Sequence, residues 1–144
     1  MRLYNSLTNK LEEFVPVKEK ELKMYVCGPT VYNYIHIGNA RPVIFFDVVK
    51  RYFEFLGYKV TYASNITDID DKIVNKAIEN NVTEKDIALK FEEAYFDDCA
   101  KLHSKKPDLV PHATDYLEDM ANYIQELIDN DYAYKVPSIM CGTE

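Results

Sequence analysis

One cysteine and one histidine mark the part of the chain with the best claim to chemistry, residues 24–51. Cys27 comes directly after a short apolar run and before a Gly-Pro pair, and His36 is followed by Gly38 and Asn39. A cysteine thiolate can bind a soft metal ion, whereas imidazole and amide groups can donate hydrogen bonds to phosphate or ribose oxygens. We therefore expect ligand binding in this stretch.

Three segments are expected to position these residues. Residues 22–26 are apolar and bounded by charge on one side, which favours a buried strand. After residues 39–42 the apolar side chains follow helical spacing as far as Leu56, and Gly57 is the expected stop. Residues 58–65 are rich in β-branched and aromatic side chains, which predicts a second strand. Strand, helix and strand predict an α/β fold with a right-handed βαβ unit and a parallel sheet.

The carboxyl ends of both predicted strands carry polar residues. Cys27 lies at the end of the first strand, and residues 65–72, with Asp68, Asp70 and Asp71, follow the second. In open α/β sheets ligands bind at this edge. The aspartates could cap the next helix, bind a ribose or hold a cation, and the sequence leaves these alternatives open.

The N-terminal end of the predicted helix is expected to favour binding of an anion. The first N–H groups of a helix are unpaired and lie at the positive end of its dipole. Gly38 allows a phosphate or a ring to approach the backbone closely.

The rest of the chain predicts helices. A short helix is expected over residues 72–81, and a longer one from Thr83, its N-cap, to residue 103. Cys99 lies on the apolar stripe of the longer helix and is therefore expected in the core. A loop over residues 105–111 leads to a third helix, residues 114–130, with an apolar stripe of its own. His103 and His112 are expected to be structural or solvated, because neither has a partner at metal-ligand spacing.

Composition limits the function further. The 144 residues carry a formal charge of −7, which argues against a general nucleic-acid coat. No apolar run reaches the roughly 20 residues of a membrane span, and the N-terminus lacks the apolar core of a signal peptide, so we expect a cytoplasmic protein without membrane contact. Three cysteines without paired spacing do not make a disulfide framework.

Two motifs resemble the cysteinyl-tRNA synthetases, a family of class I aminoacyl-tRNA synthetases. They are C-G-P-T-V-Y-N-Y-I-H-I-G-N-A-R-P from residue 27 and N-I-T-D-I-D-D-K-I from residue 65, and the similarity runs from about residue 3 to residue 134. The resemblance implies a Rossmann-like (HUP-type) parallel sheet. Residues 1–80 would be the first half of the nucleotide-binding domain and residues 81–135 a helical insertion segment, which includes P-D-L-V-P-H-A-T-D. Residues 136–144 form a tail to which no role is assigned.

The resemblance also implies roles for individual residues. Cys27 matches the first ligand of a zinc ion that selects the substrate cysteine through its thiolate. His36 and Asn39 match the ends of the H-I-G-H signature, in which asparagine here replaces the last histidine, and would assist adenylation by positioning and hydrogen bonding. The residues implied to bind nucleotide or amino acid are Gly28, Thr30, His36, Gly38, Asn39 and Asp68.

The implied activity is ATP-dependent activation of cysteine to cysteinyl-adenylate and its transfer to tRNA(Cys). ATP with magnesium is the second substrate, and we expect a monomeric protein. The family's other zinc ligands, its K-M-S-K-S loop and its tRNA-binding helical domain do not occur in these 144 residues. We therefore expect the chain alone to bind zinc weakly or not at all, and to be inactive or only nucleotide-binding. Two alternatives are a mycothiol-pathway cysteine ligase and a non-catalytic nucleotide-binding or interaction module.

Overall fold

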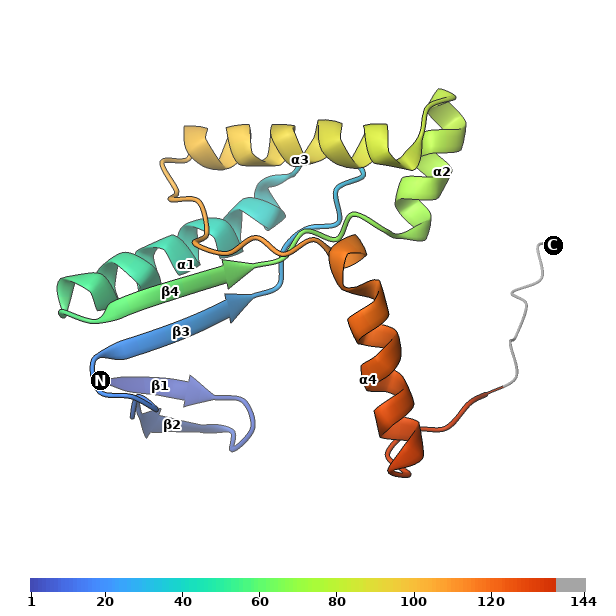
Figure 1. Ribbon diagram of the computed structural model, residues 1–144. Coiled ribbons are helices and arrows are strands. Elements are labelled where there is room, and N and C mark those ends of the chain that lie inside the picture. The colour runs from blue at the N-terminus through green and yellow to red at the C-terminus, as the bar shows by residue number, and fades with distance from the viewer. Residues whose placement is uncertain (137–144) are drawn as a thin grey trace.

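The computed structural model describes residues 1–136, so the predicted tail lies outside the described residues apart from Val136. Figure 1 shows the order of the elements along the chain. They are β1 (Arg2–Asn5), β2 (Lys10–Glu13), β3 (Glu21–Val26), α1 (Ile37–Phe55), β4 (Lys59–Ser64), α2 (Asp71–Asn80), α3 (Glu84–Lys101), the 3-10 helix η1 (Ala113–Tyr116) and α4 (Leu117–Asp129).

The central unit is a parallel pair of strands joined by a helix. β3 and β4 pair in parallel from Glu21 opposite Lys59 to Val26 opposite Ser64, and α1 connects them. The predicted βαβ unit and the α/β class are thus confirmed. The first residues form a separate antiparallel hairpin of β1 and β2.

A third segment runs beside β4 and widens this sheet. Leu109 and His112 form parallel bridges with Ala63 and Ile66, and the Ile66 N–H donates to the carbonyl of Pro111 at 2.9 Å. The sequence predicts a loop here, because prolines lack the N–H of a regular strand. A proline can still accept a hydrogen bond through its carbonyl, so the loop joins the parallel arrangement next to β4.

Helix α1 begins at Ile37, two residues before the predicted N-terminal end, because His36 serves as its N-cap. Its last residue is Phe55, and Gly57 follows with a φ of +79°, the left-handed conformation that glycine adopts at little cost. Helix α3 has the predicted N-cap, Thr83, which forms a capping box with Asp86.

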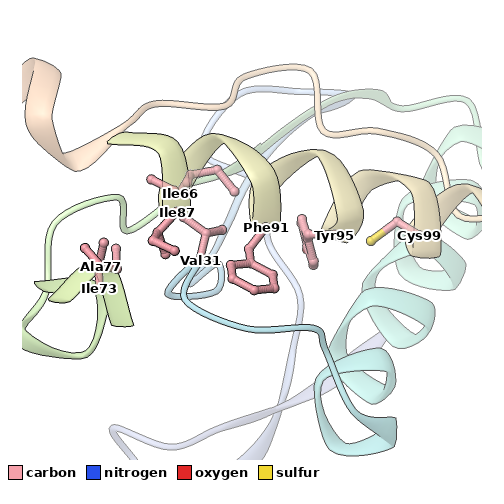
Figure 2. Close-up of a cluster of buried hydrophobic side chains, with 9 residues drawn as sticks. Val31, Ile66, Ile73, Ala77, Ile87, Phe91, Tyr95 and Cys99 are labelled. Carbon is pink, nitrogen blue, oxygen red and sulfur yellow. The ribbon is translucent and has the colours of Figure 1, made fainter. Parts of the chain in front are cut away.

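The core lies beneath α3 and holds both motif loops in place. Figure 2 shows Val31 and Ile66, one from each loop, packed near Ile87 and Phe91 of α3. Val31 and Ile66 are each only 1% exposed, and burial of such a side chain stabilises a fold by roughly 1.5–3 kcal/mol. Cys99 belongs to the same cluster, which confirms the prediction that it is a core residue.

Helix α4 differs from the other three α-helices because none of its residues is buried. It extends away from the sheet in Figure 1, and the predicted apolar stripe is exposed at Met120 and Tyr123. Within the described part of the chain, no helix is both long and apolar enough to span a membrane.

Candidate functional site

The loops that follow β3 and β4 are paired with each other. The Thr67 N–H donates to the carbonyl of Pro29 at 3.0 Å, and the Val31 N–H donates to the carbonyl of Thr67 at 3.2 Å. These bonds continue the parallel ladder beyond the strands, with Thr30 opposite Thr67. As the sequence predicts, both motifs reach the carboxyl edge of the sheet side by side.

Asn65 joins the two loops through its side chain. Its Oδ1 accepts hydrogen bonds from the Gly28 N–H at 2.9 Å and from the Tyr25 hydroxyl at 2.8 Å, while its Nδ2 donates to Oγ1 of Thr67 at 3.1 Å. The sequence motif contains Asn65 but assigns it no role. Its place directly after the second predicted strand, at the carboxyl edge of the sheet, is the signal that could have identified it.

Position 28 requires glycine because the two loops lie very close together there. A Cβ atom at Gly28 would lie 1.6 Å from the carbonyl oxygen of Asn65, which is backbone and cannot rotate away. Any larger residue would therefore push the loops apart. Gly28 thus acts on the site through its backbone.

His36, Gly38 and Asn39 form the capping box of α1. Nδ1 of His36 accepts from the Gly38 N–H at 3.0 Å, and Oδ1 of Asn39 accepts from the His36 N–H at 3.1 Å. Because Nδ1 is an acceptor, the neutral imidazole carries its proton on Nε2. Nε2 of His36 and Nδ2 of Asn39 are then both donors at the positive end of the helix dipole, which suits a phosphate oxygen.

Two hollows lie on either side of Asn39. The larger, about 270 Å³, contains His36 and Thr30. The smaller, about 70 Å³, contains Cys27 and Gly28. Asn39 lines both, so the cysteine side and the histidine side of the site meet at one residue.

Buried phenols form one wall of the smaller hollow. Burial raises the pKa of Tyr62 and the pKa of Tyr95, and both side chains line this space. Burial likewise raises the pKa of the nearby Cys99 thiol. These groups are therefore neutral at pH 7, and the two tyrosines bring no charge to the hollow that Cys27 also lines.

The aspartates of the second motif lie apart from His36. Asp68 accepts hydrogen bonds from the backbone N–H of Thr114, at 3.0 Å, and from its hydroxyl. It lines a third hollow, of about 630 Å³, which includes Asp70 and His112 and excludes His36 and Cys27. The role of Asp68 in nucleotide binding thus stays a prediction.

Asp70 and His112 have structural partners. Asp70 is the N-cap of α2, where it accepts from the Lys72 N–H at 2.9 Å, and Asp71 lies in the first turn of the same helix. The ring of His112 donates from Nε2 to the carboxylate of Glu92 at 3.0 Å.

Cys27 is the one predicted metal ligand. Its side chain is exposed, and Sγ lies 3.7 Å from the carbonyl oxygen of Gly28. Among residues 1–136 no group of three or more His, Cys, Asp or Glu side chains could hold a metal ion. The described donors therefore supply one of the four ligands that a tetrahedral zinc ion needs, and the described residues do not make a zinc site by themselves.

A parallel βαβ unit with paired loops and a donor-rich helix N-terminus at its carboxyl edge is the arrangement of a nucleotide-binding α/β domain. Residues 13–143 match the family model described as the tRNA synthetases class I (C) catalytic domain. The chain therefore belongs to this family.

Several curated proteins are similar over nearly the whole chain. The cysteine–tRNA ligase of Acholeplasma laidlawii is 54% identical over 138 residues, which are 96% of this chain and 32% of the relative. Those of Fusobacterium nucleatum and Clostridioides difficile are 54% and 52% identical over 136 residues, 94% of this chain and 29% of each relative. The chain thus spans about a third of the length of the curated relatives that it matches.

Proposed function

We propose that this chain is the first part of the catalytic domain of a cysteine–tRNA ligase, which activates cysteine with ATP and transfers it to tRNA(Cys). The observation that carries the proposal is the pairing of the loops at Thr30 and Thr67, which places the Cys27 hollow and the His36 hollow on either side of Asn39. The identity of 50% or more to proteins with this activity supports it.

Activation joins the two substrates at the α-phosphorus of ATP. A carboxylate oxygen of cysteine attacks this phosphorus, the bond to the bridging oxygen breaks, and pyrophosphate leaves with magnesium. Such a reaction needs positioning and charge stabilisation more than covalent help from the protein. The N–H of His36 at Nε2 and the amide of Asn39 would donate to phosphate oxygens as negative charge develops.

The other predicted residues would shape the two halves of the site. Thr30 would contact substrate at the edge of the larger hollow, and Gly28 would hold the backbone close to the second loop. Gly38 makes room for the imidazole of His36, since a Cβ there would lie 2.6 Å from its Cε1. Cys27 would be one ligand of a zinc ion, whose chemistry when bound is to coordinate the substrate thiolate.

The finer features of the fold are part of the same proposal. The parallel strands β3 and β4 would belong to a Rossmann-like (HUP-type) sheet, with residues 1–80 as its first half and residues 81–135 as an insertion segment. Because ATP and tRNA are the substrates of protein synthesis, we expect a cytoplasmic enzyme. Its expected state, a monomer, is part of the same proposal.

The test is ATP–pyrophosphate exchange by the full-length protein with cysteine or serine, followed by transfer to tRNA(Cys) or to an amino sugar. We expect exchange with cysteine only, and transfer to the tRNA. Transfer to the amino sugar would instead identify a mycothiol-pathway ligase. Nucleotide binding without any exchange would identify a non-catalytic module.

A further inference from the structure

The larger hollow, the one beside His36, has no Asp or Glu in its lining, although the protein is acidic. The chain has 24 acidic and 17 basic residues, yet the side chains around this space are hydroxyl, amide, imidazole, apolar and one ammonium group. They belong to Pro29, Thr30, Tyr32, Asn33, Tyr34, Ile35, His36, Asn39 and Lys72. A hollow rich in hydrogen-bond donors and free of carboxylates favours an anionic ligand.

Lys72 supplies the positive charge of this hollow. It lies in the first turn of α2, and its Nζ is 5.3 Å from the centre of the Tyr32 ring, a cation–π distance. No carboxylate of the described residues lies within 4.0 Å of this ammonium group. The neighbouring Asp70 is occupied as the N-cap of α2, and its side chain lines a different hollow.

The position of Lys72 is set by the core. The next residue, Ile73, is 1% exposed, and Ala77 one turn later is 2% exposed, so α2 is anchored beneath α3. The backbone of Lys72 is therefore held in place, and its side chain lines the hollow beside His36 and Asn39.

We propose that Lys72 binds the triphosphate of the nucleotide in this hollow, opposite the donors of His36 and Asn39. The ligand class is thus a nucleoside triphosphate, held from one side by the α1 N-terminus and from the other by the first turn of α2. This inference deepens the proposed function and rests on it for the identity of the nucleotide as ATP. Binding of the anion itself requires no cysteine.

The test compares ATP with adenosine, which lacks the phosphates, by calorimetry on the full-length protein. Lys72→Met should weaken ATP binding about tenfold or more, the effect of losing one charge-assisted hydrogen bond, and should leave adenosine binding within about twofold. Lys72→Arg keeps the charge and should stay within about threefold of the wild type for ATP. Lys76→Met is the matched control, because Lys76 lies on the same helix, pairs with Glu79 at 3.2 Å and does not line the hollow.

Two results would overturn the proposal. One is an equal effect of Lys72→Met and Lys76→Met on ATP binding. The other is a loss of tRNA binding in Lys72→Met with ATP binding unchanged, which would make Lys72 a nucleic-acid contact.

The effect of Lys72→Met on ATP binding can be judged independently of the exchange assay. If the protein shows no cysteine-dependent exchange but Lys72→Met still weakens ATP and not adenosine, the proposed function fails and this inference stands. If exchange occurs and Lys72→Met changes neither the affinity for ATP nor the KM for ATP, the inference fails and the function stands.

Discussion

At the scale of single residues, the two glycines of the site are needed for different reasons. Gly28 lets one backbone approach another, whereas Gly38 leaves space for an imidazole ring. The sequence predicts that Gly38 allows close approach at a helix N-terminus, but it cannot show that the nearest neighbour is His36. The contact of Gly28 with Asn65 joins residues 37 positions apart, so no local pattern reveals it.

The two glycines should therefore respond differently to alanine. In Gly28→Ala the new Cβ collides with the carbonyl of Asn65, and we expect a loss of about 1–3 kcal/mol or more in the free energy of unfolding. In Gly38→Ala the clash is with a side chain that can rotate, and alanine gains about 1 kcal/mol of helix propensity. Its stability should stay within about 1 kcal/mol of the wild type, while the displaced imidazole weakens ATP binding.

Urea unfolding and calorimetric titration with ATP measure the two effects. Equal stability losses in both variants would contradict the distinction between a backbone and a side-chain clash.

At the scale of elements, an ion pair holds α1 to the segment beside β4. Nζ of Lys50 lies 2.8 Å from both carboxylate oxygens of Asp108, and Oδ2 of Asp108 also accepts from the Tyr62 N–H at 2.8 Å. The side chain of Lys50 is 6% exposed, whereas that of Asp108 is 42% exposed. The pair therefore connects α1, β4 and the third segment of the sheet, with the lysine as its buried member.

The unequal exposure predicts unequal costs of mutation. Asp108→Asn leaves a buried ammonium group without its counter-charge and should cost about 1.5–3 kcal/mol in the free energy of unfolding. Lys50→Met leaves a carboxylate that water can reach and fills the buried space with an apolar chain, so its cost should be smaller. Denaturant unfolding of both variants at pH 7 decides the order, and a larger loss in Lys50→Met would contradict it.

The same pair makes stability depend on pH. The Lys50 ammonium group lowers the pKa of Asp108 in the folded protein, and the Tyr62 N–H lowers it further against the opposing effect of burial. Because the pKa of Asp108 is lower in the folded protein, its carboxylate stabilises the fold at pH values above the unfolded pKa of about 3.9. This contribution is lost as the pH falls through the folded pKa. Asp108→Asn should therefore show a shallower loss of stability in acid than the wild type.

Local patterns predicted most elements, but not the antiparallel hairpin of β1 and β2 or the segment beside β4. Apolar spacing and caps predict β3, β4 and all four α-helices to within a few residues, because these signals lie within each segment. The segment around Leu109 and His112 joins the sheet through carbonyls that accept from β4, and its prolines remove the usual sign of a strand. Only the tertiary contact reveals it.

At the scale of the whole molecule, the described residues contain both motifs of the site and one candidate zinc ligand. The sequence motifs predict which residues belong to the site. They do not predict that Asn39 lines two hollows, that Lys72 lines the same hollow as His36, or that Asp68 instead binds Thr114. These arrangements depend on how the paired loops pack beneath α3, which no short stretch of sequence encodes.

Under the proposed function, the Cys27 side of this site selects cysteine for activation. Its most direct test is cysteine-dependent ATP–pyrophosphate exchange by the full-length protein with Cys27→Ser, and with Cys99→Ala as the matched control. Cys99 is buried in the core, so its loss should cost about 1 kcal/mol of stability and leave exchange within about twofold of the wild type. Cys27→Ser should reduce kcat/KM for cysteine by about 100-fold or more, because under the proposed function it would remove one ligand of the zinc ion. Unimpaired exchange in Cys27→Ser would contradict the account.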